Sequence, residues 1–367
     1  MMLSINRRSF VRSTLLAAAF SFSAGSSAAT KDARNLHHSV LVVDGLDPSP
    51  LRVEYLDLLK AGGVSCWHCD AGGLSNFSDI LEFCDRHKER VALARSVEEI
   101  RQLHRQGRLS LIGGWQHAGV LIDEGGKEMP AIDHLRAYRE LGLGICGIAY
   151  NVANVFGGGG LKPDPGLTDT GRRLVEEIHK QRIVLDVGGH TGEKTSFDAL
   201  SMSSGVPVIC SHTNIKALND NPRCMSDPLI EGIARTGGVI GISAFSDFHV
   251  RTAMDAGVPR SPQASLDRHL DQYDYLKRLV GADHIGLGPD FIEGRNHAGH
   301  LPPEVSRVMT AEAYSQELPW FYVKGFEKIS QLPNVTQGLL DRGWTTAEVR
   351  KVLGENWLRV YEKVWGV

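Results

Sequence analysis

Two histidines and an aspartate stand where they could bind a metal ion and move a proton. His190, His212 and Asp290 each follow a short apolar run of the kind that forms a buried strand. Imidazole nitrogens bind borderline cations such as Zn²⁺, and a nearby carboxylate can position and deprotonate water. Taken singly, each histidine would fit a hydrogen-bonded structural role equally well. Taken together, the three residues predict metal-assisted hydrolysis.

The elements that would position these residues alternate regularly along the chain. Strand candidates are the runs at 39–43, 63–67, 109–113, 145–149, 183–187, 206–210, 238–242 and 284–288. Helical patterns lie between them, most clearly at 94–106, 131–141, 168–181, 227–236 and 266–280, with further helices expected from 311 and near 345–364. Strands that alternate with helices indicate parallel βαβ units, and eight units close into a (β/α)8 TIM-type barrel of the α/β class. In such barrels the chemistry lies where the strands end.

Composition and charge exclude some functions. The 367 residues are 42% hydrophobic and 23% charged, which is ordinary for a globular protein, and the formal net charge is −3. No basic stripe is present, so nucleic acid is not an expected partner. Among the six cysteines only Cys66 and Cys69 are close in sequence. For this pair we favour buried or incidental thiols over a redox or metal site.

The N-terminal segment resembles an export signal. Arg7 and Arg8 begin a twin-arginine pattern, an apolar run follows from Leu15 to about Phe22, and small residues precede Thr30. The run is too short to cross a bilayer, so no stable membrane anchor is expected. We therefore predict a signal peptide over residues 1–29, one barrel domain over 30–367, and a periplasmic or secreted protein.

Several motifs of the chain resemble those of the membrane (renal) dipeptidases, in the same order. The segment from Leu185 to Gly192 is similar to that family's D-L-S-H-x-G, and the segment from Pro207 to Asn214 is similar to P-V-I-x-S-H-S-x. Further similar segments are Asn221–Asp227, Ile285–Phe291, Arg342–Thr345 and Leu353–Val360. The resemblance runs from about residue 38 to 365 and implies a barrel that hydrolyses dipeptides with two zinc ions. A homodimer would also fit the family.

The resemblance implies a role for particular residues. His190 and His212 would hold one zinc, and Arg223 would bind the terminal carboxylate of the substrate with its bidentate fork. Asp290 would handle the attacking water or the substrate amine. Tyr150 stands where the family has a histidine that contacts the scissile carbonyl, and with Asn151 it is expected to bind substrate.

The chain departs from the family pattern within the expected metal site. Leu46 and Pro48 stand where a first-strand H-x-D pair would hold the other zinc, and Trp115 or Gln116 stands at the bridging glutamate. A neutral amide is a poor bridge between two dications. We therefore expect one zinc or none rather than two.

The third ligand of a single zinc stays open. The candidates are Gln116, which we favour, His117, Asp47 and His68. Two functions remain in view: a metallohydrolase acting on a dipeptide or similar small amide, or a non-hydrolytic protein that binds or tailors a small ligand in the same cup.

Overall fold

The computed structural model describes residues 32–250, 254–255, 258–259, 262–293, 313–314 and 320–366. The predicted export signal over residues 1–29 lies outside the described residues. Residues 294–312 and 315–319, which include most of the start of the helical region expected from 311, also lie outside them.

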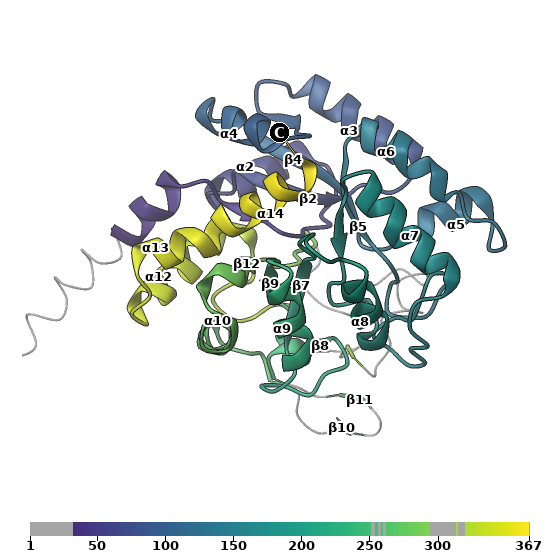
Figure 1. Ribbon diagram of the computed structural model, residues 1–367. Coiled ribbons are helices and arrows are strands. Elements are labelled where there is room, and N and C mark those ends of the chain that lie inside the picture. Colours follow the sequence, from purple (N-terminus) through teal and green to yellow (C-terminus); the bar gives the residue numbers. More distant parts are fainter. Residues whose placement is uncertain are drawn as a thin grey trace, which may run out of the picture.

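Eight parallel strands form the centre of the molecule (Figure 1). They are β1 (Val43–Asp44), β2 (Cys66–Asp70), β4 (Leu109–Trp115), β5 (Leu143–Gly147), β6 (Val184–Asp186), β7 (Cys210–Ile215), β9 (Ile240–Ile242) and β12 (Ile285–Leu287). Parallel ladders join β1 to β2, β4, β5 and β6 in that order, and join β7 to β9 and β12. Their residues are buried with few exceptions, as expected for strands covered by helices on one face and by a packed interior on the other.

Backbone hydrogen bonds join the two ladders at both edges. At one edge the N–H of Ile209 donates to the oxygen of Leu185 over 3.0 Å, and the N–H of Val187 donates to that of Ile209 over 2.9 Å. At the other edge Gly45 donates to the oxygen of Leu287, at the end of β12, over 2.9 Å. The strands therefore follow one another around a ring in chain order, which confirms the predicted barrel.

Helices surround this ring (Figure 1). They are α2 (Val53–Ala61), α3 (Leu74–Arg86), α4 (Val97–Arg105), α5 (Gly119–Gly125), α6 (Leu135–Leu141), α7 (Asp169–Lys180), α8 (Glu193–Ser201), α9 (Asp227–Arg235), α10 (Leu266–Val280), α12 (Pro333–Asp341), α13 (Thr346–Arg350) and α14 (Asn356–Trp365), with a further helix over 32–39. In α4 the hydroxyl of Ser96 caps the N-terminus by accepting the N–H of Glu99. The helix buries Val97, Ile100 and Leu103, one stripe of a helical surface.

Two differences from the sequence prediction have a physical cause. The strand predicted at 206–210 begins only at Cys210, where β7 first pairs with β9, and it continues to Ile215. Pro207 has no N–H to give to a ladder, so this end of the run cannot pair fully. The strand β3 (Val91–Leu93), which was not predicted, pairs with the first residues of β4. A strand of three residues is too short to show a period in sequence.

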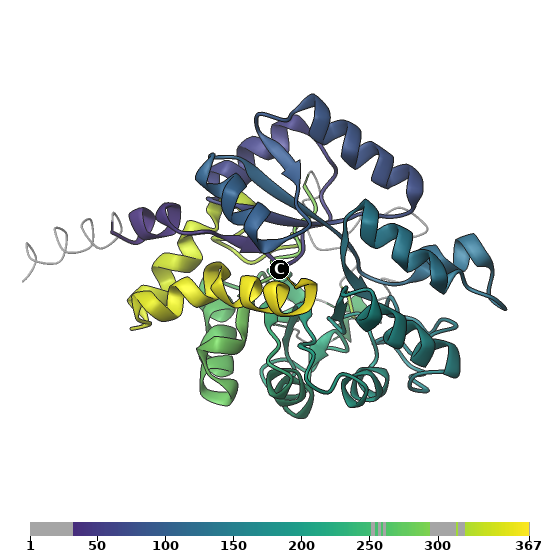
Figure 2. The ribbon, with the colours of Figure 1, turned by 45° about the horizontal axis from the view of Figure 1, so that its top comes forward.

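The C-terminal helix α14 fills the interior of the ring from one end. In Figure 2 it ends over the centre of the ring. Trp357 donates its indole N–H to the oxygen of Leu287 over 3.0 Å, and Trp365 donates to that of Gly144, near the start of β5, over 3.0 Å. Tyr361 stacks between the two indoles, with ring centroids 6.1 and 4.6 Å away. The end of the ring at which the strands finish is left for polar side chains.

Candidate active site

The polar residues predicted at the strand ends meet in one buried cluster. His190 follows β6, His212 lies in β7, and Asp290 follows β12. Arg223 precedes the short strand β8 (Cys224–Met225), which pairs with the end of β7. All four side chains are buried. The cluster therefore lies where a (β/α)8 barrel places its chemistry.

Arg223 is the centre of this cluster. Its Nη2 atom lies 3.1 Å from Nε2 of His212 and 3.3 Å from Nε2 of His190. Its Nε–H donates to the hydroxyl of Tyr314 over 2.7 Å, and its guanidinium carbon lies 5.2 Å from the centre of the Phe248 ring. One guanidinium nitrogen thus touches both imidazoles. The resemblance had placed Arg223 on the substrate instead.

His190 is held in one orientation by its neighbours. Its Nδ1–H donates to Oδ1 of Asn151 over 2.7 Å, and its ring stacks on that of Tyr150 at a centroid distance of 3.7 Å. Asn151 itself adopts a left-handed backbone with φ of 58°. The amide of Asn151 also donates to Tyr314 over 3.3 Å. Asn151 and Tyr150, predicted to bind substrate, therefore both position His190.

His212 is oriented from the other side of the cluster. Its Nδ1 lies 2.8 Å from the hydroxyl oxygen of Ser211. The carboxylate of Asp186 accepts the N–H of Ser211 over 3.0 Å and that of Gly188 over 2.7 Å. Asp186 therefore fixes the backbone that carries the histidines rather than an imidazole ring.

Both imidazoles are neutral near pH 7. Burial lowers the pKa of His190 and of His212 well below the ordinary value, and the positive charge of Arg223 lowers both further. Because Nδ1 of His190 carries the proton that goes to Asn151, its Nε2 carries a lone pair. That lone pair is the acceptor that faces Arg223.

Asp290 has the properties of a proton carrier. Burial raises its pKa to about 8; Arg223 lowers that pKa, and Asp47 raises it. Its backbone is left-handed, with φ of 60°, and its N–H donates to the oxygen of Leu46 over 3.0 Å. Its Oδ2 lies 4.0 Å from Nε2 of His212. A carboxyl group with such a pKa can both donate and accept a proton near neutrality.

Gln116, the favoured third ligand, lies beside His190. Its Oε1 is 3.1 Å from Nε2 of His190, and its amide nitrogen donates to Asp70 over 3.0 Å. His117, the next residue, uses its Nδ1 to accept the N–H of Gly119 over 3.0 Å. Gln116 is thus within reach of the cluster, whereas the Nδ1 of His117 is engaged in its own turn.

The residues around the first strand contact one another. Leu46 is fully buried and has no atom that could bind a metal. Asp47 accepts the N–H of Ser49 over 2.9 Å and the hydroxyl of Tyr55. His68 has its Nδ1 2.5 Å from the oxygen of Gly45. Of the alternative third ligands, Asp47 is therefore engaged with Ser49 and Tyr55. His68 is engaged through Nδ1, whereas its buried Nε2 has no hydrogen-bond partner among the described residues.

The arrangement does not fit a metal ion between the two histidines. Among the residues that the structure describes, no group of three or more His, Cys, Asp or Glu side chains could hold one. Each neutral imidazole has a single lone pair at Nε2, and Arg223 uses both of these. A metal at His190 and His212 would need the same lone pairs.

The six cysteines are all buried and free. This confirms the expectation that Cys66 and Cys69 are buried thiols. No helix in the described ranges is long and apolar enough to cross a membrane.

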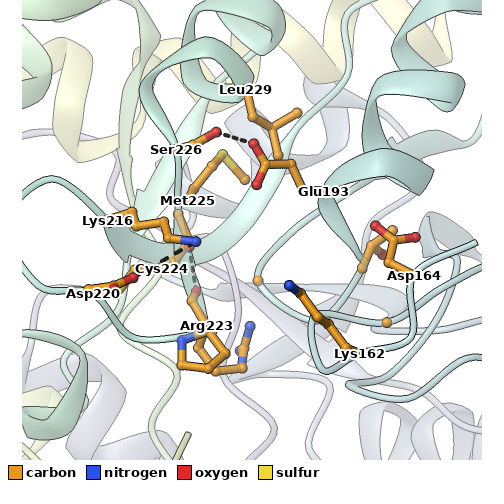
Figure 3. A pocket seen from close by; sticks show the side chains of 16 residues that line it. Lys162, Asp164, Glu193, Lys216, Asp220, Arg223, Cys224, Met225, Ser226 and Leu229 are labelled. Carbon is orange, nitrogen blue, oxygen red and sulfur yellow. Dashed lines mark hydrogen bonds and ion pairs between the residues drawn. The ribbon is translucent and has the colours of Figure 1, made fainter. Parts of the chain in front are cut away.

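A cavity of about 290 Å³ lies beside Arg223 (Figure 3). Its charged lining residues are Lys162, Lys216, Arg223, Asp164, Glu193 and Asp220. The amines of Lys162 and Lys216 reach into it from opposite sides (Figure 3). Glu193 accepts the hydroxyl of Ser226 over 2.5 Å at another part of the wall. Lys216 lies 3.9 Å from Asp220. The cavity thus presents both positive and negative groups, and two of them form an ion pair.

Tyr314 is the site residue that sequence reasoning missed. It contacts both Arg223 and Asn151. It falls beyond the eighth strand, where neither strand periodicity nor a family motif marks a residue. Ala313 before it is also described, and its oxygen accepts the side-chain amide of Asn221 over 2.8 Å. The other residues near it in the chain lie outside the described ranges.

Comparison with known proteins gives a family match over most of the chain. The model of the membrane dipeptidase family (Peptidase family M19) matches residues 72–316 and 320–367. A Klebsiella pneumoniae protein from the pqqA 5′ region is 28% identical over 286 residues, which are 75% of this chain and 90% of that protein. A dipeptidase of Claviceps purpurea, tcpJ, is 25% identical over 291 residues, 78% of this chain and 58% of its own length.

Solved structures show the same fold. An amidohydrolase from Pseudomonas aeruginosa is 28% identical, with a TM-score of 0.78 over 91% of this chain and 99% of its own. A metallopeptidase from Rhodobacter sphaeroides, solved with a phosphinate mimic of the dipeptide L-Ala-D-Ala, is 21% identical, with a TM-score of 0.70 over 89% and 99% of the two chains. At that identity the second structure is informative about the fold alone.

Proposed function

The chain belongs to the membrane dipeptidase family of hydrolases, and from this premise we propose that it cleaves a dipeptide or a similarly small amide with a free carboxylate. The observation that carries the proposal is the meeting of Arg223, Asp290 and the two histidines in one buried cluster at the strand ends. A cation, a proton carrier and fixed imidazoles are the groups that binding and cleaving such a substrate requires.

The cavity beside Arg223 supports a zwitterionic substrate. A dipeptide carries one carboxylate and one ammonium group, and the cavity offers lysines for the first and carboxylates for the second. Its volume of about 290 Å³ is at the lower end of the range for small-molecule pockets. A short, doubly charged amide fits these properties better than a large apolar ligand does.

The protein groups divide the work of amide hydrolysis. Above its pKa of about 8, Asp290 is ionised and can take a proton from the attacking water. Once protonated, the same carboxyl can deliver a proton to the leaving amine. Arg223 supplies a fixed positive charge beside which a carboxylate or a developing oxyanion is stabilised. Burial keeps the pKa of Tyr150 raised, so its hydroxyl stays a hydrogen-bond donor.

Zinc is the cofactor that the family resemblance implies. A zinc ion would polarise the substrate carbonyl and lower the pKa of a bound water. His190, His212 and Gln116 are the residues we would assign to one ion, but the imidazole lone pairs are used by Arg223. The roles given above to Asp290 and Arg223 therefore involve protein groups only.

We also propose where the protein acts. Arg7 and Arg8 and the apolar run after them support export by the twin-arginine route, with a mature barrel beginning near Thr30. That route carries folded cargo and would deliver the protein to the periplasm or beyond it. The proposed substrate would then be a small peptide of the cell envelope.

A non-hydrolytic role is the second candidate. The observation that favours it is the contact of Arg223 with both histidines, because a guanidinium cannot generate a metal-bound hydroxide. In this role the cluster would bind or tailor a small carboxylate ligand without cleaving an amide.

A panel of dipeptides separates the two candidates. We expect the mature protein to release amino acids from at least one dipeptide, and Asp290→Asn to lower kcat/KM by at least about 100-fold. Leu74→Ala, a change at an exposed position of α3, serves as the matched control and should leave the rate unchanged. A dipeptide that raises the Tm of the wild type without being cleaved would favour the second candidate.

A further inference from the structure

We infer that the guanidinium of Arg223 takes the place of a metal ion between His190 and His212, so that the wild-type protein binds no metal there. This inference rests on the proposed function in one respect, namely that the cluster around Arg223 is the functional site. Which cation the two imidazoles hold can be measured without any substrate.

The Nε2 lone pairs of His190 and His212 are not available to a metal, because each faces the guanidinium of Arg223. A neutral imidazole offers one in-plane lone pair, and metal binding and hydrogen-bond acceptance compete for it. Nη2 of Arg223 lies 3.1 Å from Nε2 of His212 and 3.3 Å from Nε2 of His190. A metal bound to either nitrogen would therefore lie against the guanidinium.

Charge also opposes a metal in this position. A divalent cation beside a buried guanidinium suffers like-charge repulsion in a medium of low dielectric constant. A carboxylate ligand would normally offset this cost. The carboxyl of Asp290 has its Oδ2 4.0 Å from Nε2 of His212, which is longer than a hydrogen bond. The guanidinium of Arg223 lies closer than that to both imidazoles.

The rest of the fold holds Arg223 in place. Its Nε–H is bonded to Tyr314 and its guanidinium lies over the ring of Phe248. Gly189 leaves room for it: a Cβ atom at that position would lie 2.3 Å from Nη1. Arg223 is only 1% exposed. The guanidinium is therefore part of a built site, and its withdrawal would leave several groups without partners.

The assignment changes what the site can do. A guanidinium gives a permanent single charge and N–H donors in fixed directions, whereas a zinc ion would also bind and acidify water. With Arg223 in this position, the proton chemistry of the site depends on Asp290. The two histidines then serve to hold the arginine.

Metal analysis of tag-free protein, purified without chelators and then dialysed against Zn²⁺ or Co²⁺, tests the inference. We expect the wild type to retain almost no metal. In Arg223→Met, which keeps a long side chain but removes the cation, we expect about one ion per chain and the visible absorption bands of bound Co²⁺. Arg223→Met combined with His212→Ala should lose this binding. Arg223→Lys, which keeps a positive charge, should stay close to the wild type.

Each result decides the question. A wild type that holds about one zinc, and loses it in His212→Ala, would overturn the inference, and so would an Arg223→Met protein that folds but gains no metal. If Arg223→Met does not fold, the wild type alone decides: zinc should leave its Tm unchanged, and a rise that His212→Ala abolishes would contradict us. Peptidase assays do not enter this test, so the proposed function can fail while the inference stands, and the reverse.

Discussion

Asp290 is the residue at which burial, charge and proposed chemistry meet. Its pKa of about 8 lies above the value of an aspartate in an unfolded chain, about 3.9. Between these values the folded protein holds a proton that the unfolded chain has released. Linkage then requires the free energy of unfolding to fall as pH rises through this range.

The first prediction follows from this sign. Asp290→Asn removes the titration, so relative to wild type the variant should become more stable as pH rises from 4.5 to 7.5, by up to about 1.4 kcal/mol per pH unit. Urea denaturation at several pH values measures the difference. Asp79→Asn, at an exposed position on α3, is the control and should show no such trend. Parallel curves for Asp290→Asn and wild type would show that Asp290 is ionised in the fold.

Gly189 shows how a residue without a side chain can determine the site. Its φ is 25°, and an added Cβ would lie 2.3 Å from Nη1 and 2.8 Å from Nη2 of Arg223. The absence of a side chain here is what admits the guanidinium. A methyl group at this position would displace Arg223 without touching a ligand.

The second prediction uses this close approach. Gly189→Ala should lower the free energy of unfolding by about 2 kcal/mol or more, because strained backbone and a steric clash add. Gly205→Ala is a matched control: its φ is 76°, but nothing lies within 4 Å of an added Cβ, so only the backbone cost of about 1 kcal/mol applies. An added Cβ at Gly189 would also lie 2.5 Å from the backbone oxygen of His212. Equal losses in the two variants would mean that Gly189 constrains neither Arg223 nor this backbone. The expected functional result is a weaker apparent affinity for substrate in Gly189→Ala alone.

At the scale of elements, the short helix α13 depends on its cap. The hydroxyl of Thr345 accepts the N–H of Glu348, and the Glu348 carboxylate accepts the N–H of Thr345, a reciprocal capping box. Lys277 of α10 lies 2.6 Å from the same carboxylate. This ion pair and the backbone bond from Thr345 lower the pKa of Glu348 to about 2.

The third prediction concerns acid stability. A lowered pKa gives stability that is present above about pH 4.5 and lost as pH falls toward 2. Glu348→Gln keeps the capping geometry but removes the charge, so it should cost about 0.5–1 kcal/mol at pH 7, and this difference should shrink below pH 4. Glu362→Gln, which breaks the exposed pair with Arg101, is the control and should be nearly neutral. A Glu348→Gln deficit that does not change with pH would contradict the assignment.

The elements also show what sequence can and cannot predict. The helix predicted at 266–280 is α10 residue for residue, because a long amphipathic period with a capping serine is a strong signal. The strand β3 was missed, because three residues are too few to show a period. The start of β7 was placed too early, because Pro207 lies in the apolar run but has no N–H for a ladder. Element existence follows from periodicity, whereas short pairings depend on neighbours far along the chain.

The same division holds for the site when the whole molecule is considered. His190, His212 and Asp290 could be brought together from sequence, because all strand ends of a barrel share one rim. The contact of Arg223 with both imidazoles could not be predicted from sequence. It depends on a side-chain conformation that Tyr314 supports and on the space left at Gly189. The family motifs give the residue types, but only the packed structure decides which cation the histidines face.

At the scale of the whole molecule, α14 fills the interior of the ring from the end opposite the site and packs where the first and last strands meet. Trp357 is fully buried, and its indole donates to the oxygen of Leu287 where β12 meets β1. A Cβ at Gly45 or at Gly286 would lie 2.5 or 2.4 Å from this indole, so both strands are shaped around it. The last helix of the chain therefore supports the join between the first and last strands.

The fourth prediction follows from this closure. Trp357→Ala should lower the free energy of unfolding by about 3–5 kcal/mol, because it leaves a cavity and removes one of the two hydrogen bonds that the oxygen of Leu287 accepts at the join. Far-UV circular dichroism during urea denaturation measures the loss, and hydrogen exchange should show it at β1 and β12 as well as in α14. Leu74→Ala, at a side chain that is 62% exposed, should change stability by less than about 0.5 kcal/mol. If Trp357→Ala raised hydrogen exchange only in α14 and left β1 and β12 protected, the join between the first and last strands would not depend on the C-terminal helix.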